Sequence, residues 1–171
     1  MANPAYIIRP ATIDDVPALA ALHVATFNET HGRGPGSPTY DLRAFQWKNA
    51  FEARDDSWFC LVIEKADGGL IGFAKGQPYH QDDHAEYKGE LNKIYLLRSF
   101  QKLGWGRQLI CKVAEEFIRR GISSMLLFGD AHNPSNQFYE HMGAQKLYAK
   151  NGAFHGGYGW PDLQRLISFC A

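Results

Sequence analysis

The 171-residue sequence has no excess of charge of either sign and no long hydrophobic run. Its 18 Lys and Arg residues balance 18 Asp and Glu residues, so no net field favours nucleic acid or a membrane surface. The longest apolar runs, such as 58–63, are far shorter than the ~20 residues that span a bilayer. The N-terminus also lacks the charged-then-apolar order of a signal peptide. We therefore expect neither a nucleic-acid partner nor a membrane partner.

Cysteine is scarce. Cys60, Cys111 and Cys170 are an odd number, stand far apart and form no Cys-x-x-Cys pair. The simplest interpretation is three reduced thiols in a cytoplasmic protein. Cys111 falls on the inner face of a predicted helix, so we do not expect it to act as a nucleophile.

Low-complexity tracts and internal repeats are also absent. The length is sufficient to bury a full core, and we predict a single domain spanning residues 1–171. Hydrophobic periodicity predicts the order β-α-α-β-β-β-α-β-α-β-β. Strands are expected at 6–9, 57–65, 70–77, 90–97, 124–128, 145–149 and 158–160, and helices from Thr12 to about Phe27, at 41–53, at 104–120 and from Asn133 to Met142. This is an α/β fold with a mixed sheet and helices on both faces, without the regular alternation of a dinucleotide-binding domain.

The most informative segment is Gln101-Lys-Leu-Gly104-Trp-Gly106-Arg107, placed where a predicted strand turns into a helix. Two glycines one residue apart let backbone N–H groups approach a ligand closely. The first amides of a helix have no acceptor within it, and the helix dipole favours an anion there. We therefore predict a phosphate-binding turn. The Gly-Lys-[Ser/Thr] ending of a Walker loop and the Rossmann Gly-x-Gly-x-x-Gly are both missing.

Gln101-x-x-Gly104-x-Gly106 resembles the [RQ]-x-x-G-x-[GA] pyrophosphate-binding motif of the GCN5-related N-acetyltransferase (GNAT) superfamily. Three other segments resemble family motifs in the same order: Arg9-Pro-Ala-Thr12-x-x-Asp15 the first strand and helix start, Asn133-Pro-Ser-Asn-Gln-Phe-Tyr139-Glu-x-x-Gly143 the second motif, and Tyr158-Gly-Trp-Pro-Asp162-Leu163 a closing strand. Lys102 stands where the family often has glycine, and Arg98 where proline is common. The resemblance covers nearly the whole chain and implies a mostly antiparallel central sheet flanked by helices on both faces.

The reaction implied by the resemblance moves an acetyl group from acetyl-CoA to a primary amine by direct attack in a ternary complex, without a metal. The main chain of one strand would hold the pantetheine arm, and the glycine turn would hold the diphosphate. The cofactor-binding residues are then Tyr95, Leu96, Leu97, Gln101, Lys102, Leu103, Gly104, Trp105, Gly106, Arg107 and Asn133. For Asn133, a helix N-cap role competes with the pantetheine contact.

Glu90 is the candidate general base, because it lies eleven residues before Gln101, as the catalytic glutamate does in histone-type members of the superfamily. The alternatives are a solvated residue at a strand start and proton removal through a water chain. Tyr139 is the candidate general acid that protonates the departing thiolate, as the resemblance implies. Its alternative role is aromatic packing beside Phe138.

Two other functions stay open: a catalytically silent acyl-CoA-binding sensor and an unrelated phosphate-binding α/β protein. The acceptor cannot be identified from the sequence, since the loop 31–38 and the helix after it are variable regions of the family. The segment His80-Gln-Asp-Asp-His84 is interpreted as a solvated loop rather than a metal site. The chain is expected to be a monomer, or a homodimer paired through an exposed final strand.

Overall fold

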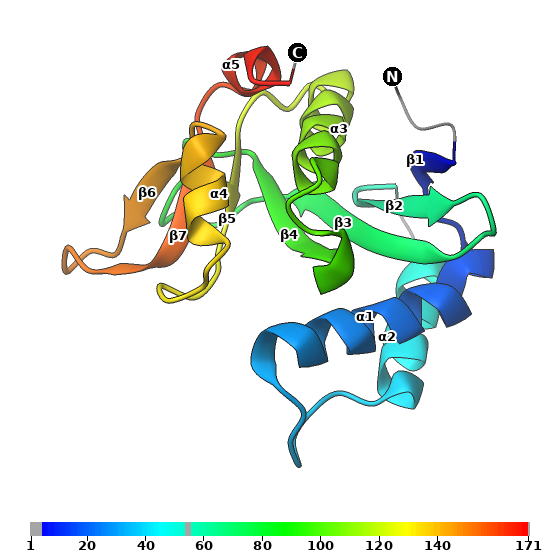
Figure 1. Cartoon of the computed structure of the whole chain (residues 1–171). Coiled ribbons are helices and arrows are strands. Elements are labelled where there is room, and N and C mark those ends of the chain that lie inside the picture. Colours follow the sequence, from blue (N-terminus) through cyan, green and yellow to red (C-terminus); the bar gives the residue numbers. More distant parts are fainter. Residues whose placement is uncertain (1–4, 54–55, 171) are drawn as a thin grey trace. The chain divides into compact units, whose positions relative to one another are not determined.

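The computed structural model describes residues 5–53 and 56–170, and its helices and strands follow the predicted order with one addition (Figure 1). The strands are β1 (Tyr6–Pro10), β2 (Phe59–Lys65), β3 (Leu70–Pro78), β4 (Gly89–Leu96), β5 (Met125–Leu127), β6 (Gln145–Tyr148) and β7 (Phe154–Trp160). The helices are α1 (Val16–His31), α2 (Tyr40–Glu52), α3 (Trp105–Arg119), α4 (Asn136–His141) and α5 (Leu163–Ser168), with short 3₁₀ turns η1 (Ile13–Asp15) and η2 (Arg98–Phe100).

The strands form a seven-stranded sheet in the order β1-β2-β3-β4-β5-β7-β6. The β1–β2, β5–β7 and β6–β7 pairs are antiparallel, whereas β4 and β5 are parallel. This confirms the predicted α/β fold with a mixed, mostly antiparallel sheet. The final strand, β7, lies between β5 and β6 and not at an edge, so the expected exposed final strand is wrong. In the described part of the chain, no helix is long and apolar enough to cross a membrane.

Contacts divide the chain into two compact units. The first comprises the chain up to Lys75 together with Lys93–Leu109, and the second comprises Gly76–Asn92 and the chain from Ile110 onward. Strands β3 and β4 and helix α3 each contribute residues to both units. The single domain over residues 1–171 stays a prediction.

In the first unit, the N-terminal strand leads into α1 through a reciprocal cap. Thr12 and Asp15 form a capping box at the predicted helix start, in which the Thr12 amide donates to Asp15 Oδ2 at 2.8 Å. The Arg9 guanidinium donates two 2.8 Å hydrogen bonds to the same carboxylate and also contacts Glu64 on β2. The Arg9 guanidinium therefore holds the pKa of Asp15 below its usual range. The charge cluster joins β1, β2 and the start of the helices.

The core of the first unit lies between α1, α2 and the sheet. Buried apolar side chains of β2 and β3 pack there against those of both helices and of the adjoining segments. The cluster consists of Ala11, Val16, Leu19, Leu22, Trp47, Trp58, Cys60, Val62 and Phe73. Tyr95 on β4 and Leu97 directly after the strand are half-buried against the same cluster. Because side chains alternate along a strand, Lys93 and Tyr95 share this face of β4.

In the second unit, the predicted helix α3 buries an apolar stripe. Ile110, Val113, Ala114 and Phe117 are at most 1% exposed, and the helix stops before Gly121, whose φ is +80°. Helix α5 is the one element that the sequence patterns missed. The Asp162 side chain accepts the amide of Gln164 at 3.0 Å and caps this helix, so the end of the segment that resembles a closing strand is helical. Strand β7 ends at Trp160.

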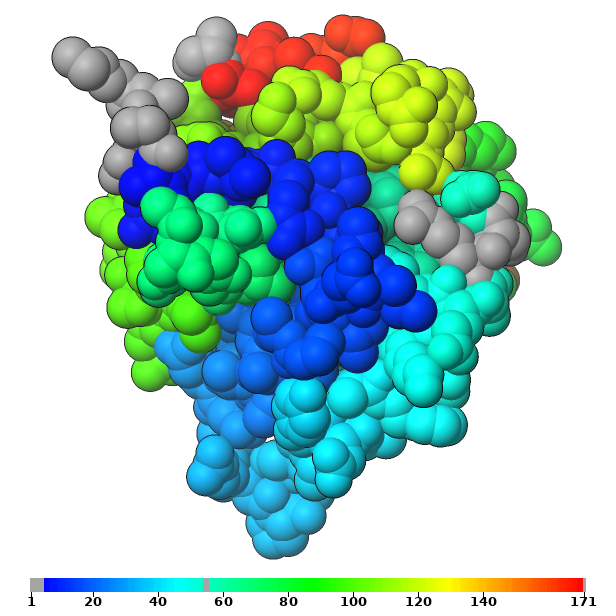
Figure 2. Space-filling model, turned by 90° about the vertical axis from the view of Figure 1, so that its right-hand side faces the viewer, coloured from blue at the N-terminus to red at the C-terminus, as the bar shows by residue number. Residues whose placement is uncertain are grey.

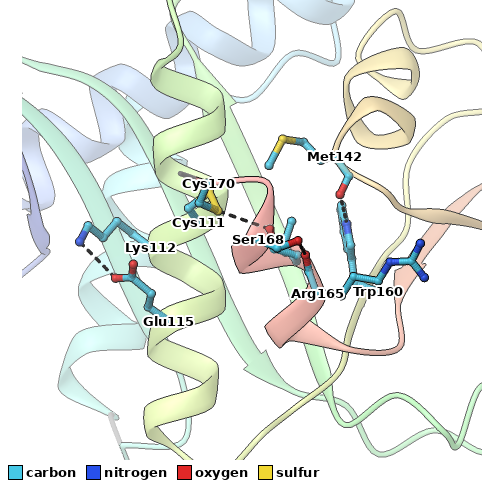
Figure 3. The surroundings of a disulfide bond; sticks show 9 residues. Cys111, Lys112, Glu115, Met142, Trp160, Arg165, Ser168 and Cys170 are labelled. Atoms are coloured by element: carbon cyan, nitrogen blue, oxygen red, sulfur yellow. Dashed lines mark hydrogen bonds and ion pairs between the residues drawn. A yellow bond between two sulfur atoms is a disulfide. The ribbon is translucent and has the colours of Figure 1, made fainter.

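A disulfide joins α3 to the end of the chain. Cys111 and Cys170 are bonded across 59 residues of sequence, with Cα atoms 6.0 Å apart (Figure 3). The prediction of three reduced thiols is therefore wrong for this pair, whereas the inward orientation of Cys111 is confirmed by its 6% exposure. Cys60 is a buried free thiol, and burial raises its pKa to about 12.

Candidate functional site

The predicted cofactor-binding segment leaves β4 and enters α3 through a short, exposed turn. Gln101 Nε2 donates to the main-chain carbonyl of Leu96 at 3.0 Å, which holds the turn against the end of the strand. Lys102 and Gly104 both have positive φ, +62° and +92°. This left-handed conformation is unstrained for glycine and costly for lysine. Lys102 therefore adopts a backbone conformation that glycine would adopt without strain.

Helix α3 begins directly after this turn. Gln108 N–H donates to Gly104 O at 3.1 Å, which starts the helical hydrogen bonding. The amides of Trp105 and Gly106 precede that bond and have no acceptor within the helix. Residues 101–104 are exposed, including the Leu103 side chain at 65%. The structure thus gives the turn the backbone donors and the helix dipole that a phosphate group needs.

Trp105 packs on the first strand. Its ring centroid lies 4.8 Å from that of Tyr6, whose ring also meets Phe100 edge-on at 6.4 Å. The sequence patterns did not connect Tyr6 with the site, because it lies far from Trp105 in the sequence. The contact fixes the orientation of the first turn of α3.

The end of β4 presents its main chain close to β3. Leu97 N–H donates to Ile71 O at 2.9 Å, and a Cβ on Gly72 would lie 3.1 Å from Tyr95 O and 2.9 Å from a Leu96 methyl carbon. A side chain larger than hydrogen at residue 72 would therefore push on the strand that carries the predicted pantetheine contacts.

Glu90 lies at the start of β4, in the second unit. Its Oε1 accepts a hydrogen bond from Gln77 Nε2 at 2.9 Å, and the side chain is half-buried. The Tyr79 hydroxyl donates to Asp83, and burial, Asp83 and the charge of Glu90 all raise the pKa of that phenol. The Gln77 side-chain amide therefore holds the Glu90 carboxylate in place. Sequence patterns did not predict Gln77, which lies thirteen residues away on β3.

The parallel pairing of β4 and β5 consists of Gly89↔Met125 and Glu90↔Leu126. Glu90 thus occupies the last position of β4 that pairs with β5, and the strand continues to Leu96 beyond it. This places the candidate base at the point where β4 leaves its parallel neighbour.

Tyr139 lies on α4 and is 7% exposed. Its ring centroid is 5.7 Å from Tyr158 and 6.2 Å from Trp160, both on β7. Trp160 is itself fixed by a 3.0 Å hydrogen bond from its Nε1 to Met142 O (Figure 3). Tyr139 therefore makes the aromatic packing that was its alternative role. This packing orients the phenol and leaves the role of its hydroxyl a prediction.

Asn133 does not cap α4 directly. Its Oδ1 accepts the Ser135 amide at 2.8 Å and its carbonyl accepts the Asn136 amide at 3.0 Å, closing a turn that precedes the helix. Helix α4 begins at Asn136, later than predicted. With Oδ1 engaged, the group that Asn133 can offer to a ligand is its Nδ2.

A shallow hollow of about 350 Å³ adjoins this turn. It is lined by α4, the turn before it and the β6–β7 hairpin, including Asn133, Asn136, Glu140, Lys146 and Tyr158. In residues 5–53 and 56–170, no group of three or more His, Cys, Asp or Glu side chains is arranged to hold a metal ion.

Comparisons with known proteins agree with this arrangement. The acetyltransferase (GNAT) family model matches residues 17–144. The uncharacterized N-acetyltransferase YuaI of Bacillus subtilis (strain 168) is 29% identical over 173 residues, covering 93% of this chain and 95% of YuaI.

Two solved structures have a similar fold. The PaiA N-acetyltransferase of Thermoplasma acidophilum, in complex with coenzyme A, is 17% identical with a TM-score of 0.70, covering 91% of this chain and 98% of its own. YncA of Salmonella typhimurium, solved with its cofactor acetyl-CoA, is 20% identical with a TM-score of 0.67, covering 93% and 94%.

Proposed function

The chain belongs to the acetyltransferase (GNAT) family and is an acyltransferase by class, and from this premise we propose that it transfers an acetyl group from acetyl-CoA to a primary amine. One observation supports the proposal for this chain itself: the exposed turn 101–104 leads directly into α3, whose first amides have no acceptor within the helix and could bind an anion. The coenzyme A and acetyl-CoA bound to PaiA and YncA, which have a similar fold, support acetyl-CoA as the donor.

In this proposal, the main-chain amides of residues 102–107 hold the diphosphate, with Gln101 keeping the turn against β4. The main chain of Tyr95, Leu96 and Leu97 holds the pantetheine arm, and the amide near Leu96 polarises the thioester carbonyl. Asn133 Nδ2 donates to the pantetheine region. Positioning of this kind converts a bimolecular encounter into an oriented attack.

The chemical step forms a C–N bond between the amine and the thioester carbon and breaks the C–S bond. The attacking amine must be neutral, and an amine with a pKa near ~10.4 is about 0.1% neutral near physiological pH. Glu90 accepts the proton that the nitrogen loses, directly or through water, and its hydrogen bond from Gln77 holds the accepting carboxylate in place. Tyr139 donates its proton to the departing thiolate.

An acetyl-CoA consumption screen against an amine library, with mass spectrometry of the products, tests the function. We expect an amide product that carries one acetyl group on the former amine nitrogen, formed in step with free coenzyme A. Calorimetric titration with coenzyme A and with ATP separates the alternatives. Binding of coenzyme A without turnover on any amine would favour a silent sensor, and a preference for ATP would favour a different phosphate-binding protein.

A further inference from the structure

Helix α2 carries an arginine whose charge has no counter-ion in the described part of the chain. Arg43 is half-buried, and its Nε is buried without a hydrogen-bond partner. Its Nη1 donates to the neutral Gln46 side chain at 3.0 Å, and its guanidinium carbon lies 5.8 Å from the ring centroid of Phe27 on α1. A guanidinium that is withdrawn from water without a carboxylate is unfavourable, so this position suits an anionic ligand.

The electrostatics of the neighbouring side chains agree with a local positive field. Burial lowers the pKa of Arg43, and the neighbouring phenol of Tyr95 opposes that shift. Burial first, and then the charges of Arg43 and Lys93, lower the pKa of His23 to about 3. Both cations therefore act on the side of the first unit where α1 and α2 cover β4. His23 stays neutral there and does not add a third charge.

Tyr95 connects this side of β4 to the proposed thioester site. The Tyr95 ring lies 5.7 Å from His23 and 5.6 Å from Phe73, so it faces the helices, while the Tyr95–Leu97 main chain holds the pantetheine arm in our proposal. The charge of Arg43 acts on the Tyr95 phenol, and the Tyr95 main chain belongs to the pantetheine site in our proposal. An acceptor whose anionic group meets Arg43 would therefore carry its amine close to that group, as a small amino acid does.

The adjoining surface is open to solvent. Phe27, His31 and the α1–α2 loop line a hollow of about 310 Å³, and the loop projects from the ends of the two helices (Figure 2). Phe27 belongs both to this hollow and to the contact with Arg43. Phe27 therefore links this solvent-open hollow to the guanidinium of Arg43.

We propose that Arg43 binds a carboxylate of the acyl acceptor, so that the acceptor is a small amino-acid-like amine. The inference rests on the proposed function and names the acceptor class of that same site. The planar guanidinium can donate two parallel hydrogen bonds to a carboxylate, which selects it over a neutral amide.

The test compares matched acceptors. Each of the common amino acids is assayed beside its carboxamide and beside the amine that lacks the carboxyl group. We expect kcat/KM for the preferred amino acid to exceed those of its two analogues at least about tenfold, since a hydrogen bond to a charged group discriminates by about this factor. Arg43→Gln should lower kcat/KM for the amino acid about ten- to hundredfold and leave the carboxamide within about twofold.

Two variants serve as controls. Lys48→Gln removes an exposed positive charge from the same helix and should not change the ratio of kcat/KM between the amino acid and either analogue. Arg43→Lys should keep part of the preference that Arg43→Gln loses, through charge alone. Thermal melting and the Kd of coenzyme A show whether each variant is folded. A wild-type enzyme that acetylates neutral amines as well as carboxylate-bearing ones overturns the inference while leaving the function intact.

Failure of the proposed function gives a different result, because no amine is then acetylated. Calorimetric titration of the amino-acid panel into the coenzyme A complex still decides the role of Arg43. Binding that is lost in Arg43→Gln and kept in Lys48→Gln supports the carboxylate site. Absence of binding to the wild-type protein, or equal binding to both variants, overturns it.

Discussion

The indole Nε1–H of Trp47 donates a 3.1 Å hydrogen bond to Nδ1 of His23, joining α2 to α1 inside the core of the first unit. His23 is 2% exposed and Trp47 4% exposed. An imidazole nitrogen accepts a hydrogen bond only when it is unprotonated, so the fold requires a neutral His23. The two helices that flank the proposed acceptor side are thus held together by a contact that acid disrupts.

Stability should fall as the pH drops through the titration of this histidine. The pKa of His23 is about 3 in the folded chain, against an unfolded value near ~6.5. Protonation in that window favours the unfolded state, so the stabilisation is complete above about pH 6.5 and is lost toward pH 3. We expect up to about 2 kcal/mol of loss between pH 7 and pH 5 in urea unfolding. His23→Gln, which keeps an acceptor oxygen, should flatten this dependence, whereas substitution of the exposed His141 should not.

Gly104→Ala should weaken coenzyme A binding about tenfold. The φ of +92° at this residue strains any side chain, by about 1 kcal/mol, and relaxing that strain turns the amides at the start of α3. Calorimetry gives the Kd. Gly152→Ala is the matched control, because its φ is +83° and its Cβ would also meet open space. Both variants should lose similar stability, and an unchanged Kd in Gly104→Ala would refute the phosphate-binding role of the turn.

Tyr139→Phe should lower kcat about hundredfold and leave the Kd of coenzyme A unchanged, since it removes only the proton donor. The phenylalanine ring keeps the packing against Tyr158 and Trp160. Tyr158→Phe removes a hydroxyl from the same aromatic cluster and serves as the control. If both variants reduce kcat equally, Tyr139 acts through packing and another group protonates the thiolate.

Removal of the Cys111–Cys170 disulfide should destabilise the second unit. Closing a 59-residue separation contributes about 4 kcal/mol in a loop-entropy model, so Cys111→Ser/Cys170→Ser should melt about 10 °C lower. A reductant should lower the melting temperature of the wild type and leave that of the double variant unchanged. Thiol titration of the denatured, unreduced protein should find one free thiol; finding all three would show that the bond does not form.

Local patterns predicted most of the secondary structure because their causes are local. The apolar stripe of α3, the Thr12/Asp15 capping box and the Asp67-Gly-Gly turn between β2 and β3 each depend on residues within a few positions of one another. Helix α5 was missed although Asp162 and the spacing of Leu163, Leu166 and Ile167 are helix signals. Asp162 and Leu163 stand in the segment that resembles a closing strand, although the strand itself ends at Trp160 as predicted.

In the candidate site, too, locally determined features were predictable from the sequence and long-range contacts were not. The sequence by itself determined the family, the order of the elements and the turn 101–107, because glycine spacing and hydrophobic periodicity act over short stretches of chain. Only the tertiary structure decided that Trp105 packs on Tyr6, that Gln77 holds Glu90, that Cys111 bonds Cys170 and that Arg43 has no counter-ion among the described residues. The residues of the three pairs are 13 to 99 positions apart in the sequence. Whether a side chain is buried, and whether its charge has a counter-ion, is decided only when distant elements pack together.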